Sequence, residues 1–329
     1  MKLASLKQGR DGELLVVDKT VKKAVRAAHI VPTMQAALDR WSEVKPLLDR
    51  LYFELNQGAV PSFNIDPKML AAPLPRAYQW VDGSAYVTHV ELVRKARGAE
   101  MPPSFWTDPL MYQGCSDSFI GPADDALFEK EEYGIDFEAE IGVITDDVPM
   151  AVSEADAAKH IQLFVLVNDW SLRNLIPGEL AKGFGFLQSK PTSSFSPVAV
   201  TVDELGSAWK DGKVHLPLVT HRNGELFGKP NAGIDMTFNF AKLVSHAAKT
   251  RRLCAGTIVG SGTISNSDRS VGSSCIAERR MLEILEKKKP ETSFMHFGDR
   301  IRIEMLDEKN ETIFGAIDQV VRQAEGSSK

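Results

Sequence analysis

Two glutamates that stand two positions apart are the first candidates for chemistry in this sequence. Glu138 and Glu140 lie in the segment FEAEIGVI, residues 137–144, in which apolar and polar residues alternate with the two-residue period of a strand. Both carboxylates therefore belong to one face, with α-carbons ~7 Å apart, which lets both side chains reach one cation. A solvated strand face has the same pattern, so the pair needs support from other residues.

A carboxylate at the end of an apolar run is the second candidate. Residues 163–167 have the length of a buried strand, and Asn168 and Asp169 follow directly. Loops at strand ends often carry functional residues on a rigid base, although Asp after Asn also forms ordinary turns. A third feature is weaker: His89 follows Asp82 by seven positions, and a histidine is more often a surface or satisfied core residue than a catalyst.

The composition is that of an ordinary globular protein. Of 329 residues, 43% are hydrophobic and 25% are charged, and no window approaches the ~20 uninterrupted apolar residues of a membrane helix. The first residues, MKLASLKQGRDG, contain no apolar stretch of signal-peptide length, so we expect a cytoplasmic protein.

The three cysteines, Cys115, Cys254 and Cys275, are far apart and lack CxxC spacing, which predicts reduced thiols rather than a disulfide framework or a zinc knuckle. A net charge of −5 lacks the basic excess of a nucleic-acid binder, so the expected partner is a small molecule.

The first 75 residues predict a small separate domain. Two short apolar runs flank a glycine-rich turn at residues 8–12 and predict a hairpin. Helical spacing over 33–57 follows, with Thr33 as the expected N-cap and Gly58 as the expected stop. A proline-rich passage from 61 to 75 comes next. We therefore expect domains at 1–70 and 71–329, with the boundary near residue 70.

Short strands dominate the rest of the chain, which predicts a β-rich α+β fold rather than an alternating β-α-β sheet. Three helices are expected, at 153–161, at 234–250 and within 172–182, with Ser153 and Asp235 as caps of the first two. Because the sheet is not of the alternating kind, the Gly-x-Gly segments at 183–185 and 260–262 do not predict a nucleotide site. The expected strands lie at 197–202, 214–223, 256–265, 300–306 and 312–317, the last two joined by a turn at 307–310.

Taken together, these motifs resemble the fumarylacetoacetate hydrolase family, in order from about residue 72 to 320. The resemblance implies a mixed β-sandwich roll, a small β-barrel-like N-terminal domain and a homodimer. The motifs that carry it are Asp82 with His89, the Glu138-x-Glu140 strand, the segment NDWSLR that ends at Arg173, the turn at Lys190, the strand GTIS with Thr263, and GDRIRIEM near the end.

The resemblance also implies one divalent cation. Hard carboxylate oxygens suit Mg²⁺ or Ca²⁺, with Mn²⁺ as a further choice, and suit thiophilic metals poorly. Four carboxylates brought together without an ion would repel one another and raise one another's pKa values. The implied ligands are Asp82, Glu138, Glu140 and Asp169.

The family chemistry assigns roles to the remaining residues. His89, oriented by Glu278, would take a proton from the attacking water. Arg173 and Lys190 would face substrate oxygens as cationic groups, with Lys190 or a water protonating the departing carbon. The implied substrate contacts are Tyr112, Arg97 and Thr263.

Several positions depart from the family pattern. Ile176 and Leu180 stand where a glutamine and a tyrosine are usual, and Ser84 replaces another tyrosine. These changes leave the acyl preference open. The acidic, glycine-bracketed segment 121–134 is either a lid over the site or a plain solvated loop.

These observations favour a hydrolase that cleaves a carbon-carbon bond in an acyl dioxo acid. The single best guess is fumarylacetoacetate, cleaved to fumarate and acetoacetate as in tyrosine catabolism. The nearest alternative is a lyase that decarboxylates oxaloacetate or dehydrates a 2-keto-3-deoxy sugar acid, which needs no hydrolytic water. A non-catalytic oxyacid-binding protein is a third alternative. His89 and Glu278 favour hydrolysis.

Overall fold

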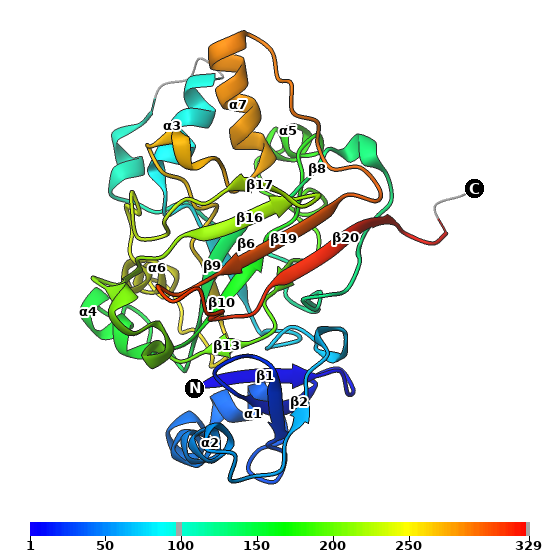
Figure 1. Ribbon diagram of the computed structural model, residues 1–329. Coiled ribbons are helices and arrows are strands. Elements are labelled where there is room, and N and C mark those ends of the chain that lie inside the picture. Colours follow the sequence, from blue (N-terminus) through cyan, green and yellow to red (C-terminus); the bar gives the residue numbers. More distant parts are fainter. Residues whose placement is uncertain (97–100, 327–329) are drawn as a thin grey trace.

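One large sheet runs through both the N-terminal segment and the rest of the molecule (Figure 1). The computed structural model describes residues 1–96 and 101–326. Among these residues the sheet has eleven strands in the order β4-β3-β2-β1-β13-β10-β9-β18-β5-β6, with β12 paired to β10. Its strands are β1 (Lys2–Leu6), β2 (Glu13–Val17), β3 (Lys23–Arg26), β4 (Phe63–Asn64), β5 (Trp80–Gly83), β6 (Met111–Gln113), β9 (Ala139–Thr145), β10 (Ile161–Asn168), β12 (Ser194–Phe195), β13 (Ala199–Val200) and β18 (Ile258–Gly260).

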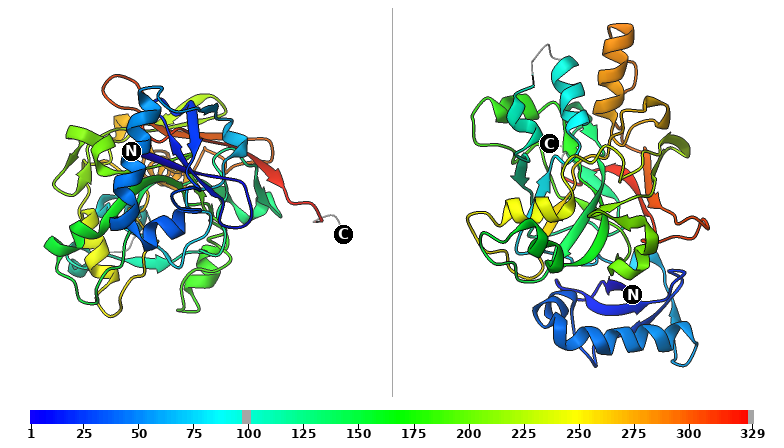
Figure 2. Two further views of the ribbon diagram at one scale, coloured as in Figure 1. Left: turned by 90° about the horizontal axis from the view of Figure 1, so that it is seen from below. Right: turned by 90° about the vertical axis from the view of Figure 1, so that its left-hand side faces the viewer.

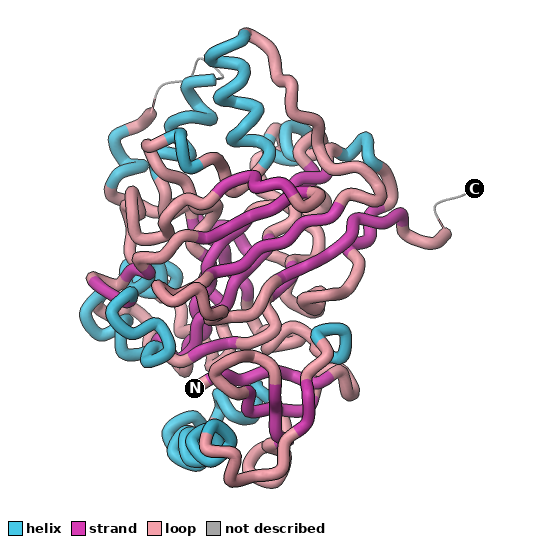
Figure 3. The backbone as a smooth tube through the Cα atoms, in the orientation of Figure 1, coloured by secondary structure: helices cyan, strands magenta, loops and turns pink. Residues whose placement is uncertain are grey.

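A second sheet of five strands packs against the first, and the side chains of both sheets form the main hydrophobic core. Its order is β17-β16-β19-β20-β7, and Figure 3 shows its strands side by side. Side chains of both sheets, such as Ile141 and Phe164 from the first and Ile303 and Ile317 from the second, belong to one buried cluster. The chain therefore has the sheet-rich, mixed α+β architecture that the sequence predicts. The strands are β7 (Ala126–Phe128), β16 (Leu218–Arg222), β17 (Glu225–Gly228), β19 (Arg300–Met305) and β20 (Ile317–Gln323); two short pairs are β8 (Ile135–Asp136) with β11 (Ser171–Leu172) and β14 (Trp209–Lys210) with β15 (Lys213–Val214).

The N-terminal segment extends the large sheet. The predicted hairpin is present as β1 and β2, and β1 pairs onward with β13. The expected helix is broken at Arg40 into α1 (Met34–Asp39) and α2 (Trp41–Asn56), with Thr33 as the N-cap of α1. In Figure 2, β1 and β2 lie between α2 and the rest of the molecule. The barrel-like N-terminal domain is not confirmed, since these described strands form part of an open sheet.

The remaining helices differ partly from expectation. The helix expected from 234 is α6 (Phe240–Ala247), because Asp235 adopts a left-handed φ of 59° and Asn239 serves as the N-cap. Two helices were not expected, α3 (Val87–Ala96) and α7 (Ile276–Lys287), and they lie side by side (Figure 1). The others are α4 (Glu154–Ala157), α5 (Ile176–Leu180) and the 3₁₀ turns η1 (Pro67–Met69), η2 (Pro103–Trp106), η3 (Glu131–Tyr133), η4 (Ala158–His160), η5 (Val202–Ala208) and η6 (Arg269–Val271).

The last strand begins later than the sequence predicts. Thr312 forms only an isolated bridge with Leu306, residues 313–316 are irregular, and β20 starts at Ile317. Gly315 has a φ of 71°, a conformation that interrupts a strand, so the expected strand at 312–317 is wrong although the turn at 307–310 is present. In the described part of the chain no helix combines the length and apolar character needed to cross a bilayer.

Candidate active site

Most of the predicted site residues surround one cavity of about 150 Å³. Asp82, His89, Tyr112, Glu138, Arg173, Lys190 and Thr263 line it, together with Ser84, Tyr86, Val90, Ile176, Phe186 and Gly262. Glu140, Asp169 and Glu278 are buried and take part through their contacts with these residues. Arg97 lies outside the described residues.

Neighbouring strands bring three carboxylates together. Asp82 is in β5, Glu140 is in β9, and Asp169 follows β10. These strands are close in the order β10-β9-β18-β5, and candidate ligand oxygens of the three side chains all lie within 4.8 Å of one another. Gly260 of β18 makes this approach sterically acceptable, because a Cβ there would lie 2.5 Å from Asp82 Oδ1. Gly260 therefore leaves room for Asp82 and for the Trp80 ring, which a Cβ at this position would approach to 2.4 Å.

Among the described residues, two of the three carboxylates, Asp82 and Glu140, form no ion pair, whereas Asp169 is paired with Lys190. Burial, Asp82 and Asp169 raise the pKa of Glu140 well above its ordinary value, and burial and Asp169 raise the pKa of Asp82 to about 8. Neither carboxylate oxygen of Glu140 has a hydrogen-bond partner among the described residues, although the side chain is fully buried. A buried, unpartnered carboxylate beside two others fits a hard divalent cation, which would neutralise the cluster.

The fourth predicted ligand, Glu138, has a different environment. It forms ion pairs with Arg173 at 2.6 Å and with Lys190. Burial would raise the pKa of Glu138, but Arg173 and Lys190 outweigh burial and lower it below its ordinary range. Lys190 Nζ also lies 2.6 Å from Asp169 Oδ2, so it links Glu138 to the other carboxylates. The assignment of all four as ligands stays a prediction.

An imidazole and a carboxylate form a pair at the rim of the cavity. His89 of α3 and Glu278 of α7 are joined by a 2.6 Å hydrogen bond between Nδ1 and Oε2. Burial would raise the pKa of Glu278, yet the bond with His89 outweighs it and keeps the pKa low. An ionised carboxylate only accepts, so Nδ1 carries the proton and Nε2 is left to accept one. This is the geometry that a general base needs.

Some structural partners of the site went unnoticed in the sequence. Asp136 accepts hydrogen bonds from Ile276 N at 2.7 Å and Ala277 N at 2.9 Å, the first amides of α7, and it pairs with Arg173 Nε at 2.7 Å. It thereby ties Arg173 to the helix that carries Glu278. The alternating pattern that marks Glu138 and Glu140 extends back to Asp136 and could have indicated it.

Glu179 is a second partner that the sequence did not reveal. Its carboxylate accepts hydrogen bonds from Leu187 N, Gln188 N and Ser189 N at 3.1, 2.7 and 3.0 Å, and from the Ser189 hydroxyl. Burial opposes ionisation, but the Ser189 hydroxyl and these amides lower the pKa of Glu179 to about 2. The contact holds the segment that precedes Lys190. Glu179 precedes residues 187–189 by eight to ten positions, and this spacing matches no motif that would indicate a contact.

The substrate side of the cavity is partly aromatic and apolar. The Tyr112 hydroxyl donates to Asp169 Oδ2, and its ring lies 5.2 Å from that of Phe186 and 5.3 Å from Lys190 Nζ. Ile176 lines the cavity as expected of a wall residue, whereas Leu180 is 46% exposed and does not.

The segment 121–134 does not form a lid over the cavity in this structure. Its strand β7 pairs with β20, and Gln319 Nε2 donates to Gly121 O at 3.0 Å and to Asp124 O at 2.9 Å. None of its residues lines the cavity.

The chain belongs to the fumarylacetoacetate hydrolase family. Residues 79–322 match the model described as Fumarylacetoacetate (FAA) hydrolase C-terminal, and residues 1–76 match Fumarylacetoacetase N-terminal domain 2. It is therefore related to enzymes that act on small molecules, in a family whose members typically bind a divalent metal.

Among curated relatives, a 2,4-didehydro-3-deoxy-L-rhamnonate hydrolase of Sphingomonas sp. (strain SKA58) is 30% identical over 59% of this chain and 60% of its own. The oxaloacetate tautomerase YisK of Bacillus subtilis is 25% identical over 61% of this chain and 64% of its own. The chain thus spans less than two thirds of the curated relatives it matches. A probable 2-hydroxyhepta-2,4-diene-1,7-dioate isomerase from Mycobacterium abscessus, at 19% identity, covers 99% of this chain and 100% of its own with a TM-score of 0.68, which shows a shared fold.

Proposed function

We propose that this chain is a cation-dependent hydrolase that cleaves a carbon-carbon bond in a small dioxo acid. The observation that carries the proposal is the pairing of His89 with Glu278 beside the buried cluster of Asp82, Glu140 and Asp169. A base that lines the same cavity as Asp82, with two further carboxylates beside it, supplies both parts of a cation-assisted hydrolysis.

The chain's own groups account for the proton transfers. Nε2 of His89 takes a proton from the attacking water, and Glu278 stabilises the imidazolium that forms. Burial would lower the pKa of Lys190, but Asp169 and Glu138 outweigh it and raise the pKa, so this ammonium stays charged beside substrate oxygens. The departing carbon takes a proton from Lys190 or from a water, and the proton held on His89 then restores that donor. When bound by Asp82, Glu138, Glu140 and Asp169, a divalent cation would polarise carbonyl oxygens and offset the developing negative charge.

The lining of the cavity favours dioxo acids other than fumarylacetoacetate. The cavity volume is about 150 Å³, and Ile176 presents an apolar wall where a polar anchor would be needed for a second carboxylate.

Tautomerisation of a small oxo acid is the second candidate. His89 and Lys190 line the same cavity, so one could remove a proton and the other return it without any attacking water. The relative in Bacillus subtilis carries the name oxaloacetate tautomerase. Lyase activity on oxaloacetate or on a 2-keto-3-deoxy sugar acid would use the same groups.

A substrate panel tests these alternatives. Acetylpyruvate, fumarylacetoacetate, oxaloacetate and a 2-keto-3-deoxy sugar acid would each be incubated with Mg²⁺ or Mn²⁺, and the products identified by NMR. We expect two carboxylic acids from acetylpyruvate, loss of turnover with a chelator, and recovery on adding metal. Enol-keto interconversion of oxaloacetate alone, release of CO₂ alone, or full turnover in metal-free protein would overturn the hydrolase assignment.

We also propose a cytoplasmic homodimer, on the basis of the family resemblance. Light scattering should then give about twice the chain mass of 36.2 kDa.

A further inference from the structure

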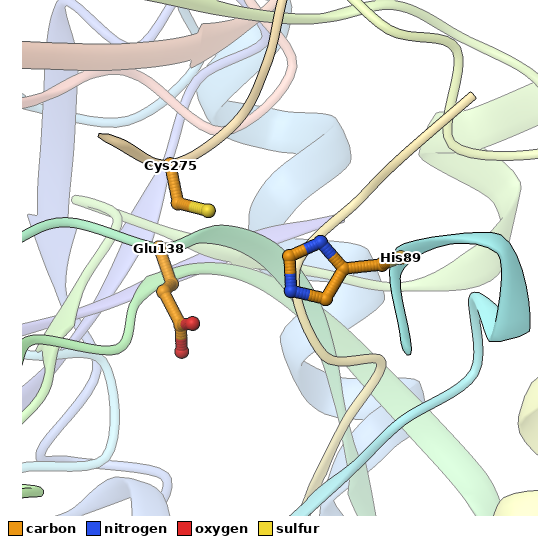
Figure 4. A group of neighbouring side chains, drawn as sticks. All are labelled: His89, Glu138 and Cys275. Carbon is orange, nitrogen blue, oxygen red and sulfur yellow. The ribbon is translucent and has the colours of Figure 1, made fainter. Parts of the chain in front are cut away.

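Three chemically different side chains meet beside the carboxylate cluster. His89, Glu138 and Cys275 each offer one ligand atom, and these atoms all lie within 4.8 Å of one another. Figure 4 shows the three side chains directed toward a common space. The proposed hydrolysis uses His89 and Glu138 but leaves Cys275 without a role.

The donor set differs in kind from that of the neighbouring carboxylates. Asp82, Glu140 and Asp169 offer only hard oxygens, which suit Mg²⁺ or Ca²⁺. Nitrogen, oxygen and sulfur together suit Zn²⁺ and other thiophilic cations, and three protein ligands with one open position are common at zinc. Two adjacent clusters therefore have opposite metal preferences.

Local structure already orients two of the three ligands. His89 Nδ1 is bonded to Glu278 at 2.6 Å, which leaves Nε2 as the free ring nitrogen. A carboxylate behind a histidine is the arrangement that fixes ring orientation in many zinc sites. Cys275 is held at the start of α7, where Glu278 N donates to its sulfur at 3.3 Å, and a β-bridge joins its backbone to that of Glu138.

The remaining adjustment is small. Ligand atoms around a tetrahedral zinc ion lie roughly 3.5 Å apart, so the three atoms must approach by about 1 Å from their separation of up to 4.8 Å. Glu138 must also loosen its ion pairs with Arg173 and Lys190, which weakens the site. The ion must also displace the proton of the Cys275 thiol, because burial and Asp136 raise the pKa of this thiol well above its ordinary value.

We propose that His89, Glu138 and Cys275 form a second metal site, selective for Zn²⁺ and Cd²⁺, whose occupation inhibits the enzyme. Inhibition follows because the ion occupies the nitrogen of His89 that would otherwise accept the proton from water. This consequence rests on the proposed function, whereas the binding of the metal does not.

Cadmium titration of the Mg²⁺-loaded full chain tests the site directly. Binding through sulfur produces an ultraviolet thiolate-to-metal charge-transfer band, which reports on cysteine without any activity assay. We expect the band in the wild type and in the matched control Cys254→Ser, and its loss in Cys275→Ser with at least a tenfold weaker affinity. Serine is a favoured N-cap, so Cys275→Ser should keep α7 folded, and Cys275→Ala serves if it does not. A band that persists in the Cys275 variants, or no band in the wild type, overturns the site.

Inhibition by Zn²⁺ tests separately whether metal at this second site lowers turnover. On whichever substrate of the panel turns over, Cys275→Ser should need at least ten times more Zn²⁺ for half-inhibition, with its activation by Mg²⁺ unchanged. Equal inhibition of wild type and variant would overturn the inhibitory role. If no dioxo acid is turned over, the proposed function fails, while the cadmium band still decides whether the site exists.

Discussion

The buried carboxylates of this site fall into two groups, which differ in whether cationic side chains balance their charge. Glu138 is balanced by Arg173 and Lys190, and its pKa is lowered. Asp82 and Glu140 have no comparable balance, and their pKa values are raised. Since Asp82 and Glu138 line the same cavity, the carboxylates without an ion pair are the ones whose charge a cation must offset.

The raised pKa values predict a pH-dependent effect of metal on stability. The folded protein holds protons that the unfolded chain releases between the ordinary Asp value of 3.8 and about 8, the pKa of Asp82. Metal-free protein should therefore lose stability as pH rises through this window. Saturating Mg²⁺ should raise the melting temperature more at pH 8 than at pH 6, by calorimetry.

Glu140→Gln supplies the control for this prediction. The amide removes one of the repelling charges, so the melting temperature should depend less on pH and the Mg²⁺ effect should shrink. An equal Mg²⁺ effect at both pH values in the wild type would contradict the assignment of unneutralised charge to this cluster.

His89 and Asp169 should differ in their response to added metal. Loss of a general base costs a factor of ~10² to 10⁴ in rate, so His89→Ala should turn over slowly with normal metal content. Asp169→Ala should lose metal affinity and recover partly at high Mg²⁺. Kinetics against Mg²⁺ concentration and metal analysis distinguish the two. Rescue of the His89 variant by Mg²⁺ would make His89 a ligand.

At the scale of elements, the segment before Lys190 depends on one carboxylate. Glu179, in α5, accepts three backbone N–H groups and one hydroxyl from residues 187–189. Glu179→Ala should release this segment and lower kcat about tenfold or more, because misplaced catalytic groups are costly even when present. Steady-state kinetics would measure the change.

The chain contains a matched control for Glu179. Glu283 of α7 accepts hydrogen bonds from Glu291 N, Thr292 N and the Thr292 hydroxyl, and none of these residues lines the cavity. Glu283→Ala should therefore lower the melting temperature similarly while kcat stays close to wild type. Equal loss of kcat in both variants would show that Glu179 acts only through general stability.

At the scale of the whole molecule, the N-terminal segment and the catalytic part share a core. One buried cluster contains Leu3, Val16 and Leu48 together with Ile144 and Val165 of the central strands. Strand β1 also pairs with β13. Burial across this contact contributes about 25 cal/mol per Å² of apolar surface. The two matched family regions are thus joined by a continuous sheet.

Removal of residues 1–70 should consequently destabilise the rest. A fragment of residues 71–329 would expose the paired edge of β13 and the apolar side chains beneath it, so we expect aggregation or a greatly lowered melting temperature. Soluble yield and thermal unfolding measure this. A soluble fragment that melts within a few degrees of the full chain would show that the two parts fold independently.

The amino-acid sequence by itself determined the family and indicated the candidate site residues. The alternation at Glu138 and Glu140 and the end of a strand at Asp169 are local patterns. They can be recognised in the sequence because residue type and spacing determine where strands form. The hairpin near the N-terminus and the Ser153 cap of α4 followed from the same local rules.

Only the tertiary structure decided which of these side chains meet. The carboxylate cluster depends on β18 lying between β5 and β9, strands far apart in sequence. It also depends on Gly260 of β18, which leaves room for Asp82 and the Trp80 ring. The pairing of Glu138 with Arg173 and Lys190 and the position of Cys275 beside His89 depend likewise on long-range packing. Local spacing carries no information about such contacts, because they are set by strand pairing and helix packing across the whole chain.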